Sequence, residues 1–430
     1  MNARARADHV VLVSIDALRP AFYRDLTWPM PTLQLFASSG AYAESVRSVF
    51  PALTYPAHTT IVTGELPARH GVRHNRPFEP AGQSGRWLWE AEHIRVPTLW
   101  DAVRAAGGTT AAISWPVTVG AAIDWNVPDV WPLDDGDPMA PIRATTTPAG
   151  LIEELEREAT GPLRGANFGI RQLAREDRVG AIGAYILERR RPTLLLMHCI
   201  GTDHVQHELG RDNPRLRRAC GAADRAISQV LEVVERLGIA DRTTFVVTGD
   251  HGSSDLHSQL RPNVWLAEAG FMERRDDRGA WRATFMASGG SAFLMLRDPA
   301  DTEAVAQVEA ILATQSPGLR RLFTIVRADE LRALGADPES PLALCAVPGV
   351  ELHESPFDPP LVAKLGAAHG YLPDMPEMRT GFVAAGAGIR RGAVVPEMGL
   401  EHIAPLVAAL LGLTFPTVDG VLLPGLVAPA

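Results

Sequence analysis

The chain has 430 residues, of which 46% are hydrophobic and 21% charged, a composition typical of globular proteins and unlike that of disordered chains. Its 41 basic and 50 acidic residues give a formal net charge of −9, and only one basic residue, Lys364, is a lysine. The absence of a basic block argues against partners such as a nucleic-acid duplex or an anionic membrane, because both need clustered cations. At roughly 150 residues per domain, the length fits about three units or one large α/β domain with an insertion.

The three cysteines, Cys199, Cys220 and Cys345, are scattered and form no CxxC pair. Neither a disulfide framework nor a thiolate zinc site is indicated, which fits a reducing compartment. The apolar run Val10–Ile15 is too short for a signal peptide and ends at Asp16, and no apolar stretch reaches the roughly 20 residues of a membrane span. We therefore expect a cytoplasmic protein without a membrane partner.

Short apolar runs separated by helical patterns predict a mostly parallel central sheet flanked by helices, and hence an α/β fold. The predicted buried strands are His9–Ile15, Thr193–Ile200 and Thr244–Val247. Apolar residues at three- and four-residue spacing predict helices over Pro97–Ala106, Gly150–Glu158, Asp177–Arg190 and Pro214–Leu237.

Between residues 259 and 352 the pattern changes to a compact α+β alternation. We predict that residues 1–258 and 353–430 form the core and that 259–352 form an inserted α+β cap subdomain. Its predicted elements, alternating strand and helix in chain order, are Thr284–Leu296, Thr302–Gln315, Leu322–Val326, Ala328–Leu334 and Leu342–Leu352.

Acidic residues and a histidine follow the predicted parallel strands within a few residues. Asp16 ends the first, Asp203 comes three residues after the second, and Asp250-His251 come soon after the third. Ligands of parallel sheets gather at the carboxyl ends of the strands, so we expect these side chains to converge.

Carboxylates and imidazoles are the zinc ligands that remain when thiolates are not offered. Asp203 and His207 are four residues apart, so a helix would place both on one face, and His369 opens the motif His369-Gly370-Tyr371. Each residue alone has an ordinary explanation, for example Asp16 as a helix cap or His207 on a solvated helix face. The metal hypothesis therefore rests on the whole set.

Thr54 is the candidate nucleophile, at the start of a helix predicted to run to Thr63. A helix N-terminus offers free N–H groups and positive potential to a phosphate, and a hydroxyl next to a metal ionises more readily. Thr54 alone would be read as a helix cap. Asn75 has the amide N–H to contact a phosphoryl oxygen, although alone it would be read as a turn residue.

The ordered set of these residues resembles the nucleotide pyrophosphatase/phosphodiesterase family of the alkaline phosphatase superfamily. The flanking residues agree with the resemblance, which spans about residues 8–260 and 355–425. The chain departs from the family pattern at Ala57, where many members carry asparagine. The matching positions are Asp16, Thr54, Asn75, Asp203, His207, Asp250, His251 and His369.

The resemblance implies an alkaline-phosphatase-like fold and two divalent metal ions, with zinc the expected metal. One ion would be held by Asp203, His207 and His369. The other would be held by Asp16, Asp250 and His251, with Thr54 as its exchangeable neighbour.

The resemblance further implies a hydrolase of phosphodiester or pyrophosphate bonds that works through a phosphothreonine intermediate, with Asn75 as a phosphoryl contact. Two cations roughly 4 Å apart can stabilise both the attacking and the leaving oxygen of an in-line displacement. Most of the remaining histidines near the motifs are expected to orient ligands or to pack.

Several alternatives remain open on the sequence. The first is a phosphonate hydrolase of the phosphonoacetate type; another is a phosphomonoesterase, for which Arg73 or Arg76 would supply the extra cation. A sulfatase is disfavoured because its Cys or Ser nucleophile motif is missing, and a metal-stabilised scaffold is disfavoured because every candidate ligand is present. The expected partner is a small-molecule phosphate ester or phosphonate, and Phe78–Trp89 together with the insertion is expected to form the pocket wall that separates these substrates.

Overall fold

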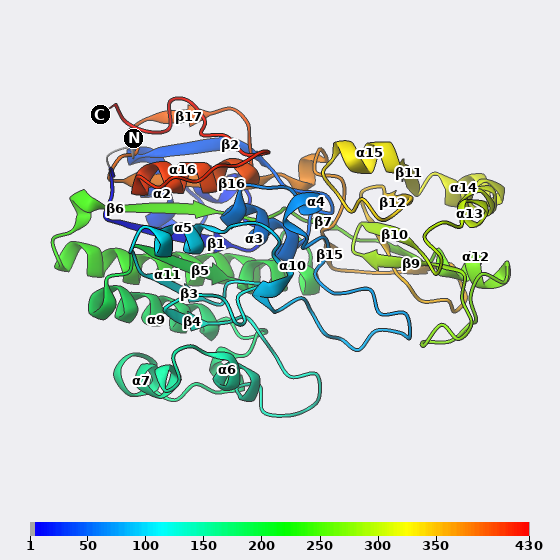
Figure 1. Cartoon of the computed structure of the whole chain (residues 1–430), viewed down its shortest axis with the longest axis horizontal. Coiled ribbons are helices and arrows are strands. Elements are labelled where there is room, and N and C mark those ends of the chain that lie inside the picture. The colour runs from blue at the N-terminus through cyan, green and yellow to red at the C-terminus, as the bar shows by residue number, and fades with distance from the viewer. Residues whose placement is uncertain (1–4, 430) are drawn as a thin grey trace.

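A computed structural model describes residues 5–429 and contains a nine-stranded central sheet (Figure 1). Its strand order is β17-β2-β16-β6-β1-β5-β3-β4, and β18 pairs with β2 beside this path. The strands are β1 (His9–Ile15), β2 (Ala41–Arg47), β3 (Thr110–Ile113), β4 (Trp125–Val127), β5 (Leu194–Cys199), β6 (Thr243–Thr248), β16 (Thr380–Gly386), β17 (Ala393–Val395) and β18 (Met398–Gly399).

The three strands predicted from apolar runs lie side by side in the middle of this sheet. β1 pairs in parallel with both β5 and β6, so Val10 lies between Leu194 and Thr244. The sheet is mixed, because β16 runs antiparallel to its neighbours β6 and β2. The predicted parallel centre is present, with one reversed strand beside it.

Both faces of the sheet are covered, which explains why β1 is apolar at nearly every position. Val11, Val13 and Ile15 belong to the core formed with α9 (Ala174–Arg190) and α11 (Pro214–Arg236). Val10 and Leu12 belong to the opposite core, which includes residues of α3 (Thr54–Thr63), α5 (Leu99–Ala105) and α16 (Ile403–Leu411). Alternate side chains of a strand point to opposite faces, so a strand buried on both sides must be apolar throughout.

The predicted helices are present, with boundaries set by local caps. α5 begins at Leu99 because Thr98 and Asp101 form a capping box, and α11 begins at Pro214 after the Asn213 side chain accepts the backbone N–H of Leu216. α9 begins at Ala174, three residues before its predicted start. The predicted helix from Gly150 divides into α7 (Leu151–Leu155) and a π turn, η2 (Glu156–Thr160).

The remaining elements of the core are short and connect the central strands. They are α1 (Ala21–Arg24), α2 (Pro31–Ser39), α4 (Pro67–His70), η1 (Ala91–His93), α6 (Ala140–Thr145), α8 (Gly165–Phe168), α10 (Gly201–Leu209), η3 (Ala240–Arg242), β7 (Ser254–Asp255), β15 (Ala367–Ala368), η4 (Pro376–Met378) and η5 (Leu400–His402).

A second, four-stranded antiparallel sheet of order β11-β12-β10-β9 forms the lobe on the right of Figure 1. The run predicted as one strand from Thr284 is a hairpin that turns at Gly289 and Gly290. The elements here are α12 (Asn263–Glu268), β9 (Ala283–Ser288), β10 (Ser291–Leu296), α13 (Thr302–Thr314), α14 (Pro317–Arg320), β11 (Phe323–Arg327), α15 (Ala328–Ala333) and β12 (Leu342–Ala346).

The last predicted strand of the insertion is also divided. After β12 the chain forms β13 (Val350–Leu352), which pairs with β8 (Ser258–Leu260), and β14 (Leu361–Ala363) pairs with the other edge of β8. This small sheet joins the two ends of the inserted stretch. The division of the chain at residues 258 and 352 stays a prediction.

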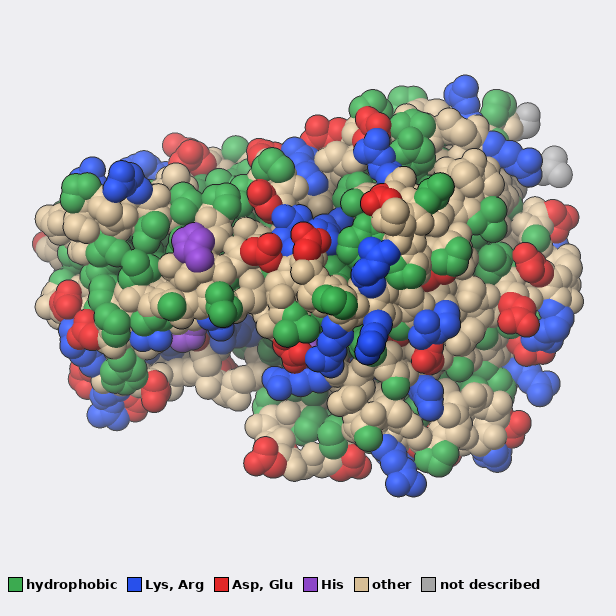
Figure 2. All heavy atoms as spheres, turned by 180° about the vertical axis from the view of Figure 1, so that it is seen from behind, with side chains coloured by type: hydrophobic (Ala, Val, Ile, Leu, Met, Phe, Trp, Pro, Cys, Tyr) green, Lys and Arg blue, Asp and Glu red, His purple; other side chains and the backbone are tan. Residues whose placement is uncertain are grey.

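Within residues 5–429, no helix combines the length and the apolar character that crossing a bilayer requires. Acidic and basic side chains are intermixed over the face drawn in Figure 2.

A buried carboxylate fixes the connection between β5 and α10. Glu176 of α9 is 1% exposed and accepts the backbone N–H groups of Ile200 (3.1 Å) and Gly201 (2.7 Å). These donors lie at the start of α10, where the helix offers N–H groups without intrahelical partners. Glu176 therefore holds the helix that carries Asp203 and His207.

We expect Glu176→Ala to lower the free energy of unfolding by about 2–4 kcal/mol, because two buried N–H groups lose their acceptor. Glu176→Gln retains an acceptor oxygen and should cost less than half as much. Denaturant unfolding of the two variants measures both effects, and equal losses would show that the hydrogen bonds to α10 are not what Glu176 contributes.

Candidate functional site

The predicted acidic residues meet at the carboxyl ends of the central strands. His251 is the centre of one cluster, with Nε2 lying 3.4 Å from Asp16 Oδ1, 3.2 Å from Asp250 Oδ2 and 3.3 Å from Thr54 Oγ1. Asp16, Asp250 and His251 are each 4% exposed or less. Residues separated by more than two hundred positions thus form one buried group.

A second cluster adjoins the first. Asp203 and His207 share one side of α10, as their spacing predicts, with Asp203 Oδ2 and His207 Nε2 3.2 Å apart. The ring of His369, which follows β15, lies 5.0 Å from the His207 ring and stacks on the His251 ring at 3.7 Å. Ligand atoms of Asp203, His207 and His369 all lie within 4.8 Å of one another, and so do those of Asp16, Asp203 and His251.

Backbone carbonyls orient two of these imidazoles. His251 Nδ1 lies 3.0 Å from the carbonyl oxygen of Gly252, and His369 Nδ1 lies 2.8 Å from that of Ala52. A carbonyl oxygen only accepts, so Nδ1 carries the proton in both rings and Nε2 presents its lone pair. This is the tautomer that a metal-binding histidine needs.

The electrostatics of the cluster are unfavourable without a cation. Burial, reinforced by the neighbouring Asp250 carboxylate, raises the pKa of Asp16 well above its usual range, and burial also raises the pKa of Asp250. Burial lowers the pKa of His251 to about 4 and that of His369 to about 3. Adjacent carboxylates and neutral imidazoles together are the donor set that divalent cations such as Zn²⁺ prefer.

The Asp203–His207 pair behaves differently. Although burial opposes it, the Asp203 carboxylate raises the pKa of His207 to about 9. In return His207 holds the pKa of Asp203 below its usual range, against the effect of burial. A proton on His207 takes the position that a cation would occupy between the two groups.

Two acceptor atoms of the first cluster have no hydrogen-bond partner among the described residues: Asp16 Oδ1 and Asp250 Oδ2. Buried carboxylate oxygens are costly to leave without a donor or a cation. The donor set therefore fits divalent cations, and the residues whose ligand atoms lie together are Asp203, His207 and His369 in one group and Asp16, Asp203 and His251 in the other.

Thr54 is the first residue of α3, and its side chain points at the cluster instead of capping the helix. The helix terminus offers fewer free donors than the sequence suggested. The Tyr55 N–H is donated to Asn75 Oδ1 at 2.9 Å, and Pro56 has no N–H. Among the described residues, this leaves the N–H of Thr54 as the free donor of the first turn.

Two further buried histidines surround the carboxylates, as expected of residues that orient ligands. His198 Nε2 lies 3.3 Å from Asp16 Oδ2, while its Nδ1 lies 3.1 Å from the Ser114 carbonyl oxygen. His58 Nδ1 lies 2.8 Å from the Thr54 carbonyl oxygen and 3.7 Å from Asp250 Oδ2. Their partners are distant in sequence, so only the folded chain reveals which carboxylate each one faces.

A cavity of about 320 Å³ opens beside the clusters, with walls from the core and from the inserted stretch. Its inserted wall approaches His369 closely, because a side chain at Gly289 (φ +60°) would place its Cβ 2.1 Å from the His369 carbonyl oxygen. The lining residues are Leu53, Asn75, Arg76, Trp87, His207, Ala287, Ser288, Gly289, Glu351, Leu352, His353, Glu354 and His369.

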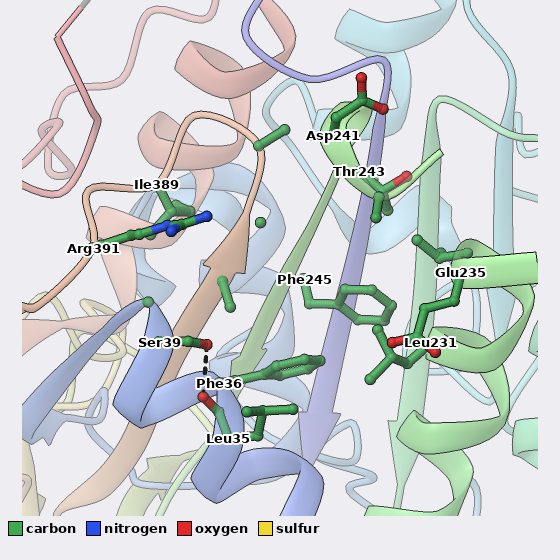
Figure 3. A pocket seen from close by; sticks show the side chains of 16 residues that line it. Leu35, Phe36, Ser39, Leu231, Glu235, Asp241, Thr243, Phe245, Ile389 and Arg391 are labelled. Atoms are coloured by element: carbon green, nitrogen blue, oxygen red, sulfur yellow. Dashed lines mark hydrogen bonds between the residues drawn. The ribbon is translucent and has the colours of Figure 1, made fainter. Parts of the chain in front are cut away.

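A larger cavity, of about 640 Å³, lies at the opposite end of β6, between α2, α11 and β16 (Figure 3). Phe36, Phe245 and Ile389 form apolar walls, and the Ser39 hydroxyl there bonds to the Leu35 carbonyl oxygen at 2.7 Å. None of the predicted site residues lines this cavity, so the smaller one is the candidate active site.

Comparison with known proteins fits this geometry. Residues 10–365 match the family described as type I phosphodiesterase/nucleotide pyrophosphatase. The chain belongs to this family. The resemblance predicted from the ordered motif residues is thereby confirmed.

Solved structures of the family share the fold. Human ectonucleotide pyrophosphatase/phosphodiesterase 5 superimposes with a TM-score of 0.70 at 19% identity, covering 96% of this chain and 97% of that one. An inactive threonine-to-alanine variant of the murine protein, in complex with AMP, gives a TM-score of 0.68 at 20% identity, covering 95% and 96%. The predicted α/β, alkaline-phosphatase-like fold is confirmed.

Sequence relatives of the family are distant. An uncharacterised pyrophosphatase/phosphodiesterase of Schizosaccharomyces pombe is 25% identical over 63% of this chain, and human ectonucleotide pyrophosphatase/phosphodiesterase 5 is 22% identical over 56%. The matches span about half the length of these two curated relatives, 50% and 44%. A mouse bis(5'-adenosyl)-triphosphatase is 22% identical over 96% of this chain and 79% of its own length.

The paired carboxylates give a test of the cation site. In chelator we expect Asp250→Asn to be more stable than the wild type by about 1 kcal/mol, because it removes one of two adjacent buried charges. Added zinc at 100 times the dissociation constant should stabilise the wild type by about 2.7 kcal/mol per site, and the variant only at its remaining site. Urea unfolding with and without zinc measures both.

Asp241→Asn, at an exposed and distant carboxylate, is the matched control and should behave like the wild type in both conditions. Absence of any zinc effect on wild-type stability would contradict the site as described.

Proposed function

We propose that this chain hydrolyses phosphodiester or pyrophosphate bonds in small molecules, with Thr54 as the nucleophile. The observation that carries the proposal is the position of the Thr54 hydroxyl, 3.3 Å from His251 Nε2, where the carboxylate and imidazole clusters meet. Membership of the family supports the reaction class. The inactive threonine-to-alanine variant of the murine relative supports a threonine in this role.

We further propose two zinc ions as cofactors. Asp203, His207 and His369 would hold one ion, and Asp16, Asp250, His251 and Thr54 the other. When bound, the ions supply positive charge that favours ionisation of the hydroxyl and neutralises charge on the attacking and leaving oxygens.

Thr54 does the covalent chemistry. Its Oγ gives up its proton and forms a bond to phosphorus while the bond from phosphorus to the leaving oxygen breaks, which gives a phosphothreonine; the leaving oxygen takes up a proton and departs as the alcohol or phosphate. A water oxygen then loses a proton and bonds to phosphorus as the bond to Thr54 Oγ breaks, and Oγ takes up a proton, which restores the threonine.

Donors beside Thr54 contact the phosphoryl oxygens. Asn75 Oδ1 is committed to the Tyr55 N–H, so the Asn75 side-chain N–H groups face the cavity. With the free N–H of Thr54 they form a short row of neutral donors where negative charge develops.

The charge of the cavity favours substrates whose phosphate carries a single negative charge. Arg76, the arginine among its lining residues, is paired with Glu354 at 3.0 Å, and Arg73 is paired with Asp337 at 2.9 Å. Among the described residues that line the cavity, no unpaired arginine is therefore present to meet the second charge of a monoester or the carboxylate of phosphonoacetate. Leu53, Trp87 and Leu352 supply apolar and aromatic surface for the ester group.

Two relatives point to nucleotides within that class. The mouse relative is named as a bis(5'-adenosyl)-triphosphatase, and the murine structure contains AMP. A dinucleoside polyphosphate has the internal pyrophosphate bonds that the proposed reaction cleaves.

Thr54→Ala should lower turnover of bis-p-nitrophenyl phosphate by at least about 1,000-fold at unchanged protein stability, since the attacking oxygen is gone. Steady-state kinetics with added zinc, together with zinc content, measures this. Thr63→Ala, at the other end of the same helix, is the control and should retain activity within a factor of about three, because among the described residues the Thr63 hydroxyl donates to the Thr59 carbonyl oxygen and accepts the N–H of Glu65 just beyond the helix. A Thr54→Ala variant as active as the wild type would refute the nucleophile.

Glu354→Gln tests the substrate preference. We expect the wild type to prefer bis-p-nitrophenyl phosphate over p-nitrophenyl phosphate by more than about tenfold in kcat/KM. The variant keeps an oxygen that accepts from Arg76 but removes the neutralising charge, so the ratio of monoester to diester activity should rise several-fold. Glu303→Gln, at an exposed carboxylate of α13 outside the cavity, should leave the ratio unchanged. An unchanged ratio in Glu354→Gln would show that the ion pair does not select the substrate.

A further inference from the structure

The residues just before Asn75 are tied to the inserted stretch. Arg73 Nη1 lies 2.9 Å from Asp337 Oδ1 and 2.7 Å from Glu339 Oε1, and His74 Nε2 lies 3.4 Å from Asp337 Oδ2. Asp337 is 3% exposed and also accepts the backbone N–H of Glu339 at 3.0 Å. One buried carboxylate on the loop between α15 and β12 thus binds two consecutive residues of the Asn75 loop.

The residue just after Asn75 is tied to the same part of the chain. Arg76 Nη2 donates to the backbone carbonyl oxygen of Ala287 in β9 at 3.1 Å and to Glu354 Oε1 at 3.0 Å. Ala68 adds a backbone contact upstream, since its N–H donates to the Gly335 carbonyl oxygen at 2.8 Å. Asn75 therefore lies between two anchors, neither of which belongs to the central sheet.

Among the described residues, Asn75 itself makes two hydrogen bonds to the core. Its Oδ1 accepts the Tyr55 N–H, and its backbone carbonyl oxygen accepts the N–H of Leu88, both at 2.9 Å. Neither bond fixes the chain on both sides of Asn75. The flanking residues that do so are Arg73, His74 and Arg76, all bonded to the inserted stretch or its end.

We propose that Arg73 and Asp337 are positioning residues, through which the inserted stretch places the Asn75 amide against the phosphoryl group. The inference rests on the proposed role of Asn75 and extends it, because it makes the second sheet part of the catalytic geometry as well as a cavity wall. Ion pairs with little exposure, here 12% for the Arg73 and 5% for the Asp337 side chain, hold a fixed geometry because water competes poorly for them.

The Arg73–Asp337 ion pair is suited to positioning Asn75 because its strength depends on the relative orientation of the two side chains. A bond from a guanidinium to a carboxylate constrains angle as well as distance, which an apolar contact does not. A displacement of about 1 Å at a group that contacts the reacting centre is enough to cost up to 100-fold in rate. Loss of the anchor should therefore slow catalysis without loss of any group that touches the substrate.

A double-mutant cycle tests the inference. Asp337→Ala should lower kcat for bis-p-nitrophenyl phosphate by about tenfold, with KM changed less than threefold and zinc content unchanged. In an Asn75→Ala background the same substitution should cost less than twofold, since the amide it positions is gone. Equal losses in the two backgrounds, or no loss in the first, would overturn the inference.

Controls separate positioning from folding. Asp337→Asn keeps an acceptor for Arg73 and should restore most of the rate, whereas Arg73→Met should reproduce Asp337→Ala even if the latter is unstable. Arg282→Met breaks another ion pair of the inserted stretch, with Asp301 at 2.6 Å, that does not touch the Asn75 loop. It should leave kcat within a factor of two.

A second readout does not depend on turnover. The side-chain amide ¹H–¹⁵N resonances of Asn75 should shift in Asp337→Ala and in Arg73→Met, but not in Arg282→Met. Unshifted resonances in the first two variants would reject the anchor even if the enzyme is active. An Asn75→Ala variant with wild-type kcat would reject instead the proposed role of Asn75, while shifted resonances would still support the anchor.

Discussion

Asp16 and Asp250 lie side by side in the protein interior, and their mutual repulsion is the constraint on which the rest of the site depends. Both carboxylates are nearly inaccessible to water, and each has one oxygen without a hydrogen-bond donor among the described residues. The nearby imidazoles of His251 and His369 are kept neutral by burial, so they do not relieve the repulsion. Either a proton on Asp16, whose pKa is raised, or a cation between these groups relieves the repulsion.

The fold concentrates this unfavourable group where the backbone can support it. Three adjacent parallel strands end at the same edge and deliver Asp16, Asp203 and Asp250 together. Backbone carbonyls fix the two imidazoles, and α3 brings Thr54 to the cluster from one side of the sheet. The inserted sheet closes the arrangement, because Gly289 packs against His369 and residues next to Asn75 bond to it.

Much of this arrangement could be predicted from the sequence, because it depends on residues that are close together in the chain. β1 is observed at its predicted bounds, because a strand of seven residues that is buried on both faces forms a nearly continuous apolar run. The four-residue spacing of Asp203 and His207 brings them together on α10, as predicted. The predicted strand from Thr284 is a hairpin instead, since Gly289 and Gly290 permit a turn that the apolar pattern on both sides conceals.

Long-range pairing could not be predicted. From the sequence, Arg73 and Arg76 are expected to be free to bind a substrate anion. In the structure both are ion-paired, with Asp337 and Glu354, which lie 264 and 278 residues further along the chain. The sequence likewise predicts free N–H groups at the helix terminus beside Thr54. In the structure one of them, the N–H of Tyr55, is donated to Asn75 Oδ1, twenty residues further along the chain. The sequence identifies which residues carry a charge or can donate a hydrogen bond. Whether such a group is free to bind a substrate depends on its tertiary contacts.

We propose that the buried carboxylates and imidazoles hold a pair of cations. The most direct measurement is the number of divalent ions per folded chain, obtained by elemental analysis after gel filtration in metal-free buffer, for the wild type and for Asp203→Ala with Asp16→Ala. We expect two ions per wild-type chain and none in the double variant. A wild-type chain that retains no stoichiometric ion, or a double variant that retains both, would contradict this proposal.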